Sequence, residues 1–326
     1  MCLKRLTLFF SFTTLLGFSA FAQDSTSFKP SGKVIAQSFF DYSAGFGGAN
    51  DKSGFNLTRA YLGYNYKITP ELSAQVVIDG AAETTSAGKY ELNVKNAFIN
   101  WSKDRLNVSV GMIGLTQFNL QEKYWMHRYV EKTFQDKNKM SSSADLGVSA
   151  SYRIHPLISV DASIINGEGY RTVSRNNSNK YTIGANIYPL RNFVLRGFIS
   201  TYTDSENLRG STIAGAEAKY KNENAISLFA GYQDKKLSAG VEFSETFNKA
   251  FVEKRNYYGT SAFASYKTSS MVDVYARYDY LASKTPQFDG TIWSENDGHT
   301  FIGGLGYSPM KQVRISPNIR LINLKH

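Results

Sequence analysis

Apolar and polar residues alternate with a period of two along most of this chain. In the run 271–280, one face is apolar or aromatic and the other carries two aspartates and an arginine. Such alternation is typical of a β-strand with one face in an apolar medium. The runs are about 9–11 residues long, which is the length of a tilted strand that crosses a bilayer.

The pattern recurs often enough to predict a single all-β domain. The remaining runs are 33–43, 55–68, 71–79, 90–102, 105–112, 145–154, 157–166, 180–188, 193–203, 212–221, 225–246, 256–268, 299–308 and 311–322. A soluble sandwich also alternates, but here the polar face consists mainly of Gly, Ser, Asn and Thr rather than of solvent-coating Lys and Glu. We therefore expect a transmembrane antiparallel up-and-down β-barrel of about 16 strands, with a narrow polar lumen.

Aromatic residues at strand ends support the barrel. They make up 14% of the chain, and its 21 tyrosines nearly equal its 22 phenylalanines, although the mean hydropathy is below zero. Several stand just before a short turn: Tyr66, Trp101, Tyr152, Tyr188, Tyr220, Tyr266 and Tyr307. Amphipathic rings at one end of many strands are typical of a membrane-interface girdle, and short turns are typical of the periplasmic side.

The connections at the other strand ends are longer, as extracellular loops are. They cover 44–54, 80–89, 114–143, 167–179, 204–211, 247–255 and 283–298. A segment as long as 114–143 inside a compact domain is normally functional. We expect this third extracellular loop to fold into the lumen.

The N-terminus predicts export. Lys4 and Arg5 precede the apolar run 6–18, and Ala20-Phe21-Ala22 is a small-residue cleavage site. We expect residues 1–22 to be a signal peptide for Sec-type export and 23–326 to form the barrel in the bacterial outer membrane. The single cysteine, Cys2, lies in the signal, so the mature chain has no disulfide, thiolate metal site or cysteine nucleophile.

Composition and motifs point away from several other functions. The net charge of +10 raises nucleic-acid binding, but export makes a positively charged pore the better explanation. None of the four histidines has a metal-ligand spacing, and no nucleophile and base form a recognisable motif. Asn166-Gly-Glu-Gly169 precedes a polar loop rather than a helix, so it is no phosphate-binding motif. We expect no enzymatic activity and no cofactor.

Several stretches resemble the phosphate-selective porin O and P family, in particular its Bacteroidetes-type branch. They are Phe55–Gly63, Lys95–Trp101, Gly111–Gly114, Ser143–Gly147 and Arg277–Tyr280. The likeness covers nearly the whole mature chain. It implies a sixteen-stranded outer-membrane barrel that is often a homotrimer and passes small anions such as phosphate.

Arginines on the polar face of the strands are the main candidates for pore residues. Arg59, Arg196 and Arg277 lie in the middle of runs, where an arginine facing lipid would cost about 2–4 kcal/mol. We expect them to face the lumen, where they lower the barrier for anions. Alternatively, they pair with inward-facing acids and only rigidify the barrel; the available acids are Asp79, Asp161, Glu217, Glu242 and Asp279.

The long loop adds further basic residues. Lys123, Arg128 and Lys132 are its anion-binding candidates, and aromatic side chains such as Trp125 can pack the loop against the wall. The best-known members of the porin O and P family concentrate arginines here to hold phosphate bidentately. Because Arg128 is the only arginine in this loop, the sequence argues against tight phosphate selectivity.

The sequence thus predicts a porin for passive diffusion of small hydrophilic solutes, biased towards anions. One alternative is a substrate-specific channel, for instance for oligosaccharides, with inward aromatic rings as a stacking track. Its rings would be Tyr61, Phe98, Phe198, Phe229, Phe263 and Tyr275. Another alternative is a structural or adhesive barrel with a plugged lumen.

The C-terminal run raises a question about closure. Barrels of this type have an even number of strands, with both termini on the periplasmic side. If the turn after Tyr307 is periplasmic, the run 311–322 must travel outward. We therefore expect either that one strand is misassigned in the crowded stretch 225–246 or that the closing strand is missing.

Overall fold

A computed structural model describes residues 28–45, 53–82, 89–205, 219–284 and 297–324. The predicted signal peptide, the predicted strand over 212–221 up to residue 218, and Glu217 lie outside these residues. Within them, no helix is long and apolar enough to cross a membrane.

The predicted all-β, antiparallel up-and-down architecture is confirmed. One sheet holds all sixteen strands, and each pairs with its neighbour in sequence, except that β15 and β16 both pair with β14. The strands are β1 (Ser31–Ala44), β2 (Ser53–Lys67), β3 (Leu72–Ala82), β4 (Tyr90–Lys103), β5 (Leu106–Gly114), β6 (Ala144–His155), β7 (Ile158–Ile165), β8 (Lys180–Ile187), β9 (Phe193–Tyr202), β10 (Glu223–Gln233), β11 (Leu237–Phe247), β12 (Asn256–Lys267), β13 (Val272–Lys284), β14 (Gly298–Met310), β15 (Val313–Ile315) and β16 (Asn318–Leu324).

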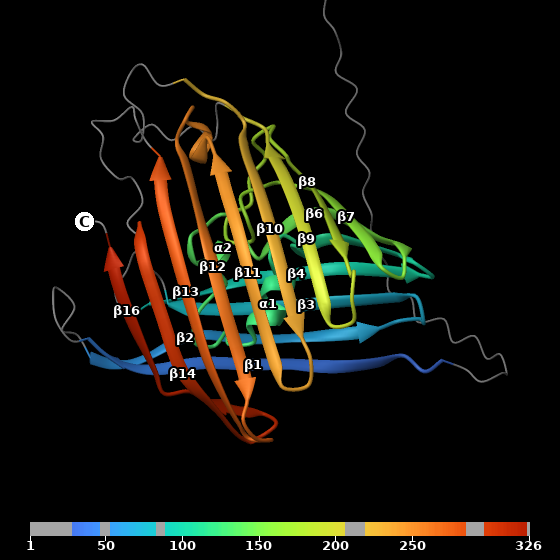
Figure 1. Ribbon diagram of the computed structural model, residues 1–326. Helices are drawn as coiled ribbons and strands as arrows, with labels where there is room; N and C mark the ends of the chain where they lie inside the picture. The colour runs from blue at the N-terminus through green and yellow to red at the C-terminus, as the bar shows by residue number, and fades with distance from the viewer. Residues whose placement is uncertain (1–27, 46–52, 83–88, 206–218, 285–296, 325–326) are drawn as a thin grey trace, which may run out of the picture.

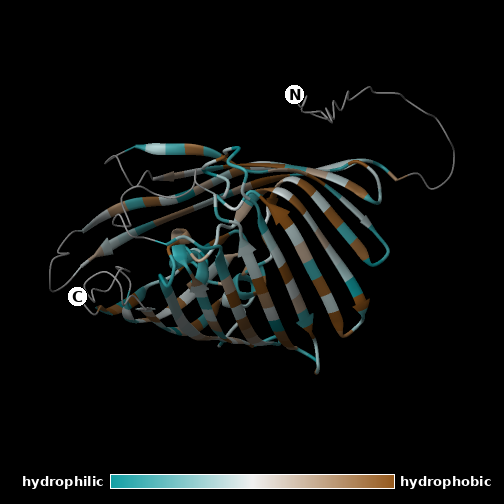
Figure 2. Ribbon diagram, turned by 90° about the horizontal axis from the view of Figure 1, so that it is seen from above, coloured by the Kyte–Doolittle hydropathy of each residue, from teal (hydrophilic) through white to brown (hydrophobic). Residues whose placement is uncertain are grey.

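The sheet curves round so that its two ends face each other across the molecule (Figures 1 and 2). Within the described residues, β1 pairs only with β2, and β15 and β16 pair only with β14. Both ends of the sheet therefore have a free edge in this structure. Two short helices, α1 (Asn119–Trp125) and α2 (Phe134–Lys137), lie inside the curve.

The predicted faces of the strands agree with the exposure of their side chains. Along β13, Val274 and Tyr278 are exposed on the outside, whereas Asp273, Tyr275, Arg277 and Asp279 are buried inside. Figure 2 shows the same alternation of hydrophobic and hydrophilic residues along many strands. The outer face would lie in lipid and the inner face lines the lumen.

The stretch 225–246, expected as one crowded strand region, is a hairpin of two strands. Asp234 accepts hydrogen bonds from the backbone N–H of Lys236 and Leu237, at 2.8 and 2.7 Å, and so fixes the tight turn between β10 and β11. This turn lies at the short-turn end of the barrel. Consequently, residues 222–224, expected to form a short periplasmic turn after Tyr220, lie at the long-loop end, where β10 begins at Glu223. The girdle assignment of Tyr220 was therefore wrong.

Five of the other predicted girdle positions keep their places beside short turns, whereas Tyr188 is half-buried and packs against the core cluster that includes Trp125, so its girdle assignment was wrong. Tyr66, Trp101, Tyr152, Tyr266 and Tyr307 are all exposed near the ends of β2, β4, β6, β12 and β14. The last predicted strand, 311–322, is divided into β15 and β16 at Ser316-Pro317, where the proline has no N–H to donate to the ladder.

Candidate functional site: a passage beside the long loop

The long loop between β5 and β6, residues 115–143, folds into the lumen as predicted and attaches to one wall. Ser238 Oγ donates to the Tyr124 carbonyl at 2.7 Å, and Arg277 donates to the Lys132 carbonyl at 2.5 Å. Arg314 donates to the Met126 carbonyl at 3.3 Å. These contacts tie the loop to the part of the sheet formed by β10–β16.

Aromatic packing reinforces this attachment. Trp125 on α1 packs edge-on against Phe263 and Tyr275, with ring centroids 5.5 and 5.7 Å apart, and Tyr124 packs against Phe229 at 5.5 Å. Each such pair contributes about 0.5–1.5 kcal/mol beyond its buried area. Phe229, Phe263 and Tyr275 are three of the six rings proposed as a sugar-stacking track, and the loop covers all three.

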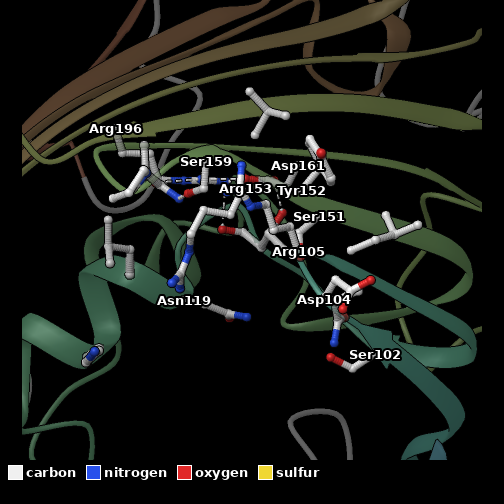
Figure 3. Close-up of a pocket in the computed structure, with 18 residues that line it drawn as sticks. Ser102, Asp104, Arg105, Asn119, Ser151, Tyr152, Arg153, Ser159, Asp161 and Arg196 are labelled. Carbon is white, nitrogen blue, oxygen red and sulfur yellow. Dashed lines mark hydrogen bonds and ion pairs between the residues drawn. The ribbon is translucent and has the colours of Figure 1, made fainter. Parts of the chain in front are cut away.

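The lumen stays open on the opposite side of the loop. A cavity of about 740 Å³ lies between the start of α1 and the strands β4–β9 near the short turns. Asn119 on α1 faces Ser159, Asp161 and Arg196 on the strand wall across it (Figure 3). A second cavity of about 330 Å³ shares Asn119 and Lys123 with the first. Together they mark a passage along the N-terminal half of the sheet.

The loop presents its three predicted anion-binding residues to this passage or close to it. Lys123 is exposed and lines both cavities, and no carboxylate among the described residues lies within 4 Å of its Nζ. Arg128 lines the second cavity and pairs with Glu122 and Asp136 at 3.4 and 3.3 Å. Lys132 lies 3.8 Å from Asp136 and keeps 36% of its side chain exposed.

Arg59 on β2 faces inward and is paired with an acid. It forms an ion pair with Asp79 on β3 and donates to the Tyr170 hydroxyl at 3.3 Å. The Tyr170 hydroxyl in turn donates to Asp79 at 2.5 Å. Tyr170 comes from the loop between β7 and β8, so this trio connects two strands and a loop.

Arg196 and Arg277 also face inward, and each holds an aspartate. Arg196 bonds to Asp161 at 2.7 and 3.1 Å and lines the larger cavity. Arg277 bonds to Asp279 through two parallel contacts of 2.8 Å and lies under the Trp125 ring, 5.1 Å from its centroid. Arg277 is fully covered by the loop and is absent from the lining of both cavities.

Lys95 on β4 is an inward-facing cation that the sequence pattern missed. Its Nζ lies 3.1 Å from the Tyr61 hydroxyl and 4.3 Å from the centre of that ring. Strand β4 has a bulge here, because Val77 pairs with Asn96 while Ile78 pairs with Val94, which leaves Lys95 as the extra residue. A bulge changes which residues face inward, so strict alternation cannot predict the direction of Lys95.

The cations on both sides of the passage influence one another. Burial lowers the pKa of Lys132, and the charges of Arg59, Arg128 and Arg171 lower it further, while Asp136 opposes the shift. Lys132 on the loop is thus within electrostatic reach of arginines from β2 and from the β7–β8 loop. Positive charges are therefore concentrated between the long loop, strand β2 and the β7–β8 loop.

The glycines of Asn166–Gly169 do bind an anion, but it belongs to the chain itself. Asp145 accepts hydrogen bonds from the backbone N–H groups of Gly167 and Gly169 at 2.8 and 3.1 Å. Both glycines have positive φ, which lets their N–H groups converge. Across the described ranges, no group of three or more His, Cys, Asp or Glu side chains is arranged to hold a metal ion.

Comparisons with known proteins identify the architecture. The family model described as beta-barrel porin-2, OmpL-like, matches residues 143–325. A comparison with curated protein sequences gave no match. The phosphate-selective porin O and P family is not confirmed by these matches.

Solved porin and channel structures have the same fold at low sequence identity. OmpF of Salmonella typhi, in complex with daunomycin, matches with a TM-score of 0.64 and 13% identity over 91% of each chain. DcaP, an outer-membrane channel of Acinetobacter baumannii, matches with a TM-score of 0.59 and 12% identity, over 89% of this chain and 90% of its own. OmpT of Vibrio cholerae, in its trimer form, matches with a TM-score of 0.59 and 13% identity, over 90% of this chain and 88% of its own.

Proposed function

The chain belongs to the beta-barrel porin-2, OmpL-like family of outer-membrane porins, and on that premise we propose that its passage favours small anions such as phosphate. The observation that carries the proposal is the surplus of positive charge where the long loop faces strands β2 and β4. Lys123, Arg128 and Lys132 stand on the loop side, and Arg59 and Lys95 stand on the wall side. A ring of positive charge lowers the electrostatic barrier for anions.

The acids near the passage do not cancel this surplus. Asp79 is completely buried beneath Arg59 and Tyr170. Asp136 is largely buried and lies between Arg128 and Lys132. Of the acids that line the cavities, Asp161 is paired with Arg196, Glu122 lies 3.4 Å from Arg128, and Asp104 is exposed near the short turns. Cations outnumber these acids in the lining of the two cavities, where they are Lys123, Arg105, Arg128, Arg153 and Arg196.

The six predicted pore residues contribute in different ways under this proposal. Lys123, Arg128 and Lys132 supply charge from the loop. Arg59 and Arg196 face the lumen while sharing their charge with Asp79 and Asp161. Arg277 lies on the side of the loop away from the passage and holds the loop through its hydrogen bond to the Lys132 carbonyl.

A planar-bilayer measurement tests the proposal. Under a KCl gradient, the reversal potential of the wild-type channel should shift towards the chloride potential, and the double variant R128Q/K132M should reduce this shift. The matched control is Lys139→Met, because Lys139 is an exposed lysine of the same loop that lines neither cavity. Replacing chloride with phosphate then shows whether phosphate itself is conducted.

The same recording separates the alternatives. Cation preference, or an unchanged reversal potential in R128Q/K132M, contradicts the anion proposal. Block by an oligosaccharide at low concentration would favour a substrate-specific channel. Absence of conductance would favour a plugged structural or adhesive barrel, against which the two cavities beside the loop argue.

We propose the same export route and assembly that the sequence suggests. A signal peptide over 1–22 predicts that protein isolated from the outer membrane begins at Gln23, which N-terminal sequencing would show. Homotrimer formation is supported by the trimer form of Vibrio cholerae OmpT. Chemical cross-linking in native membranes should give a band of three times the chain mass.

A further inference from the structure

Behind the long loop, on the side away from the passage, lies a buried carboxylate. Glu242 on β11 faces the lumen and is 3% exposed. It accepts a hydrogen bond at 3.2 Å from the side-chain amide of Gln135 on α2. No lysine, arginine or histidine nitrogen of the described residues lies within 4 Å of it.

Other buried acids of the wall show what Glu242 lacks. Asp161 and Asp279 each form close ion pairs with an arginine. Asp273 contacts both Arg314 and His127. A buried carboxylate without a partner of opposite charge is unfavourable, so it is either protonated or balanced by a cation. Among the described residues, the neighbouring side chains do not supply that cation for Glu242.

The surroundings of Glu242 are rich in oxygen atoms. Ser261 stands directly opposite Glu242 on β12, and its Oγ is buried without a hydrogen-bond partner. Gln117 donates to Gln135 at 2.8 Å through its amide nitrogen, which leaves its own carbonyl oxygen buried and unpartnered. Both the carbonyl oxygen and the amide nitrogen of Gln121 are also buried and unpartnered; Gln121 belongs to α1, the helix that packs on β10, β11 and β12.

One carboxylate among neutral amide and hydroxyl oxygens is a donor set for a hard cation. Hard cations prefer oxygen ligands of these types. A single negative charge is balanced by a single positive charge, which favours a monovalent ion over a divalent one. Water could occupy the same space, but it would leave the carboxylate uncompensated.

We propose that Glu242, with Gln117, Gln121 and Ser261, binds a monovalent alkali cation such as Na⁺ between the long loop and the wall. The ion would join the loop segments that carry Gln117, Gln121 and Gln135 to strands β11 and β12. It would thereby fix the position of the loop, and so the width of the passage. The site is separate from the residues that face the passage, so its test is independent of ion selectivity.

The test is the thermal unfolding midpoint of the full-length protein in detergent at constant ionic strength. NaCl, KCl and N-methyl-D-glucamine chloride are compared, because the organic cation is too large for the site. The wild-type midpoint should be about 2–4 °C higher in NaCl than in the organic salt. Glu242→Gln keeps the shape but removes the charge, so its midpoint should be the same in all three salts.

Glu122→Gln is the matched control, since Glu122 lies on the other face of the loop beside Arg128. This variant should keep the wild-type response to Na⁺. If the wild type has one midpoint in all three salts, the buried carboxylate is protonated or hydrated and the proposal is overturned. A Na⁺ response that survives in Glu242→Gln overturns it as well.

Discussion

His127 Nε2 lies 2.7 Å from Asp273 Oδ2, and this contact joins the long loop to strand β13. His127 is completely buried, and its Nδ1 faces the Trp125 carbonyl oxygen at 2.8 Å. Arg314 on β15 approaches the other oxygen of Asp273 at 2.6 Å. One carboxylate thus holds both the loop and the strand that pairs with the end of β14.

Asp273→Asn should loosen this attachment. The substitution removes the negative charge shared by His127 and Arg314, and breaking a buried pair in this way costs about 3–5 kcal/mol. We expect a lower thermal midpoint and larger current fluctuations in single-channel recordings, because the loop edge bounds the passage. Glu71→Gln, at the exposed turn between β2 and β3 and outside the lining of both cavities, is the control and should behave like the wild type. If the current fluctuations of Asp273→Asn were the same as those of the wild type, other contacts would hold the loop.

Lys95→Met should reduce anion preference. Lys95 contacts the Tyr61 hydroxyl and ring on the inner wall, and its charge adds to that of the loop cations. Because a lumen charge is screened less than a surface charge, its removal should shift the reversal potential measurably. Lys103→Met removes an equal charge from the exposed end of β4. A shift of the same size in both variants would place Lys95 outside the conducting path.

Anion preference should fall as the pH rises above neutrality. The pKa of Lys132 is below the ordinary lysine value, because of burial and of the nearby charges of Arg59, Arg128 and Arg171. Lys132 consequently loses its proton at a lower pH than an exposed lysine does. Reversal potentials recorded between pH 7 and pH 10 should decline in the wild type and decline less in Lys132→Met. Parallel pH curves for the two proteins would contradict this role of Lys132.

The sequence was most informative where a strand has one lipid face. Most outward positions in the middle of the strands carry an apolar or aromatic residue, so period-two alternation predicts both the strand and the direction of Arg59, Arg196 and Arg277. The pairing partners Asp79, Asp161 and Asp279 were also among the acids available to them. Which cation pairs with which acid depends on strand register, and alternation does not fix the register.

The sequence was less informative where local structure breaks the period. The bulge at Lys95 and the tight turn at Asp234 each change the count of residues along a strand or between strands. The sequence predicts that the loop enters the lumen, but not the wall to which it attaches. This attachment depends on contacts such as Trp125 with Phe263 and His127 with Asp273, which join residues more than a hundred positions apart.

The assignment of the two faces of the sheet can be tested with one pair of neighbouring substitutions. Val148 lies near the middle of β6 with 43% of its surface exposed on the outer face, and Ser149 beside it faces the lumen. An arginine that faces lipid at mid-membrane depth costs about 2–4 kcal/mol, whereas a lumen arginine remains hydrated. Val148→Arg should therefore fold poorly into lipid vesicles, while Ser149→Arg should fold nearly as well as the wild type. The folded fraction is read from the shift between unheated and boiled samples on a gel. Poor folding of Ser149→Arg together with normal folding of Val148→Arg would mean that the inner and outer faces are exchanged.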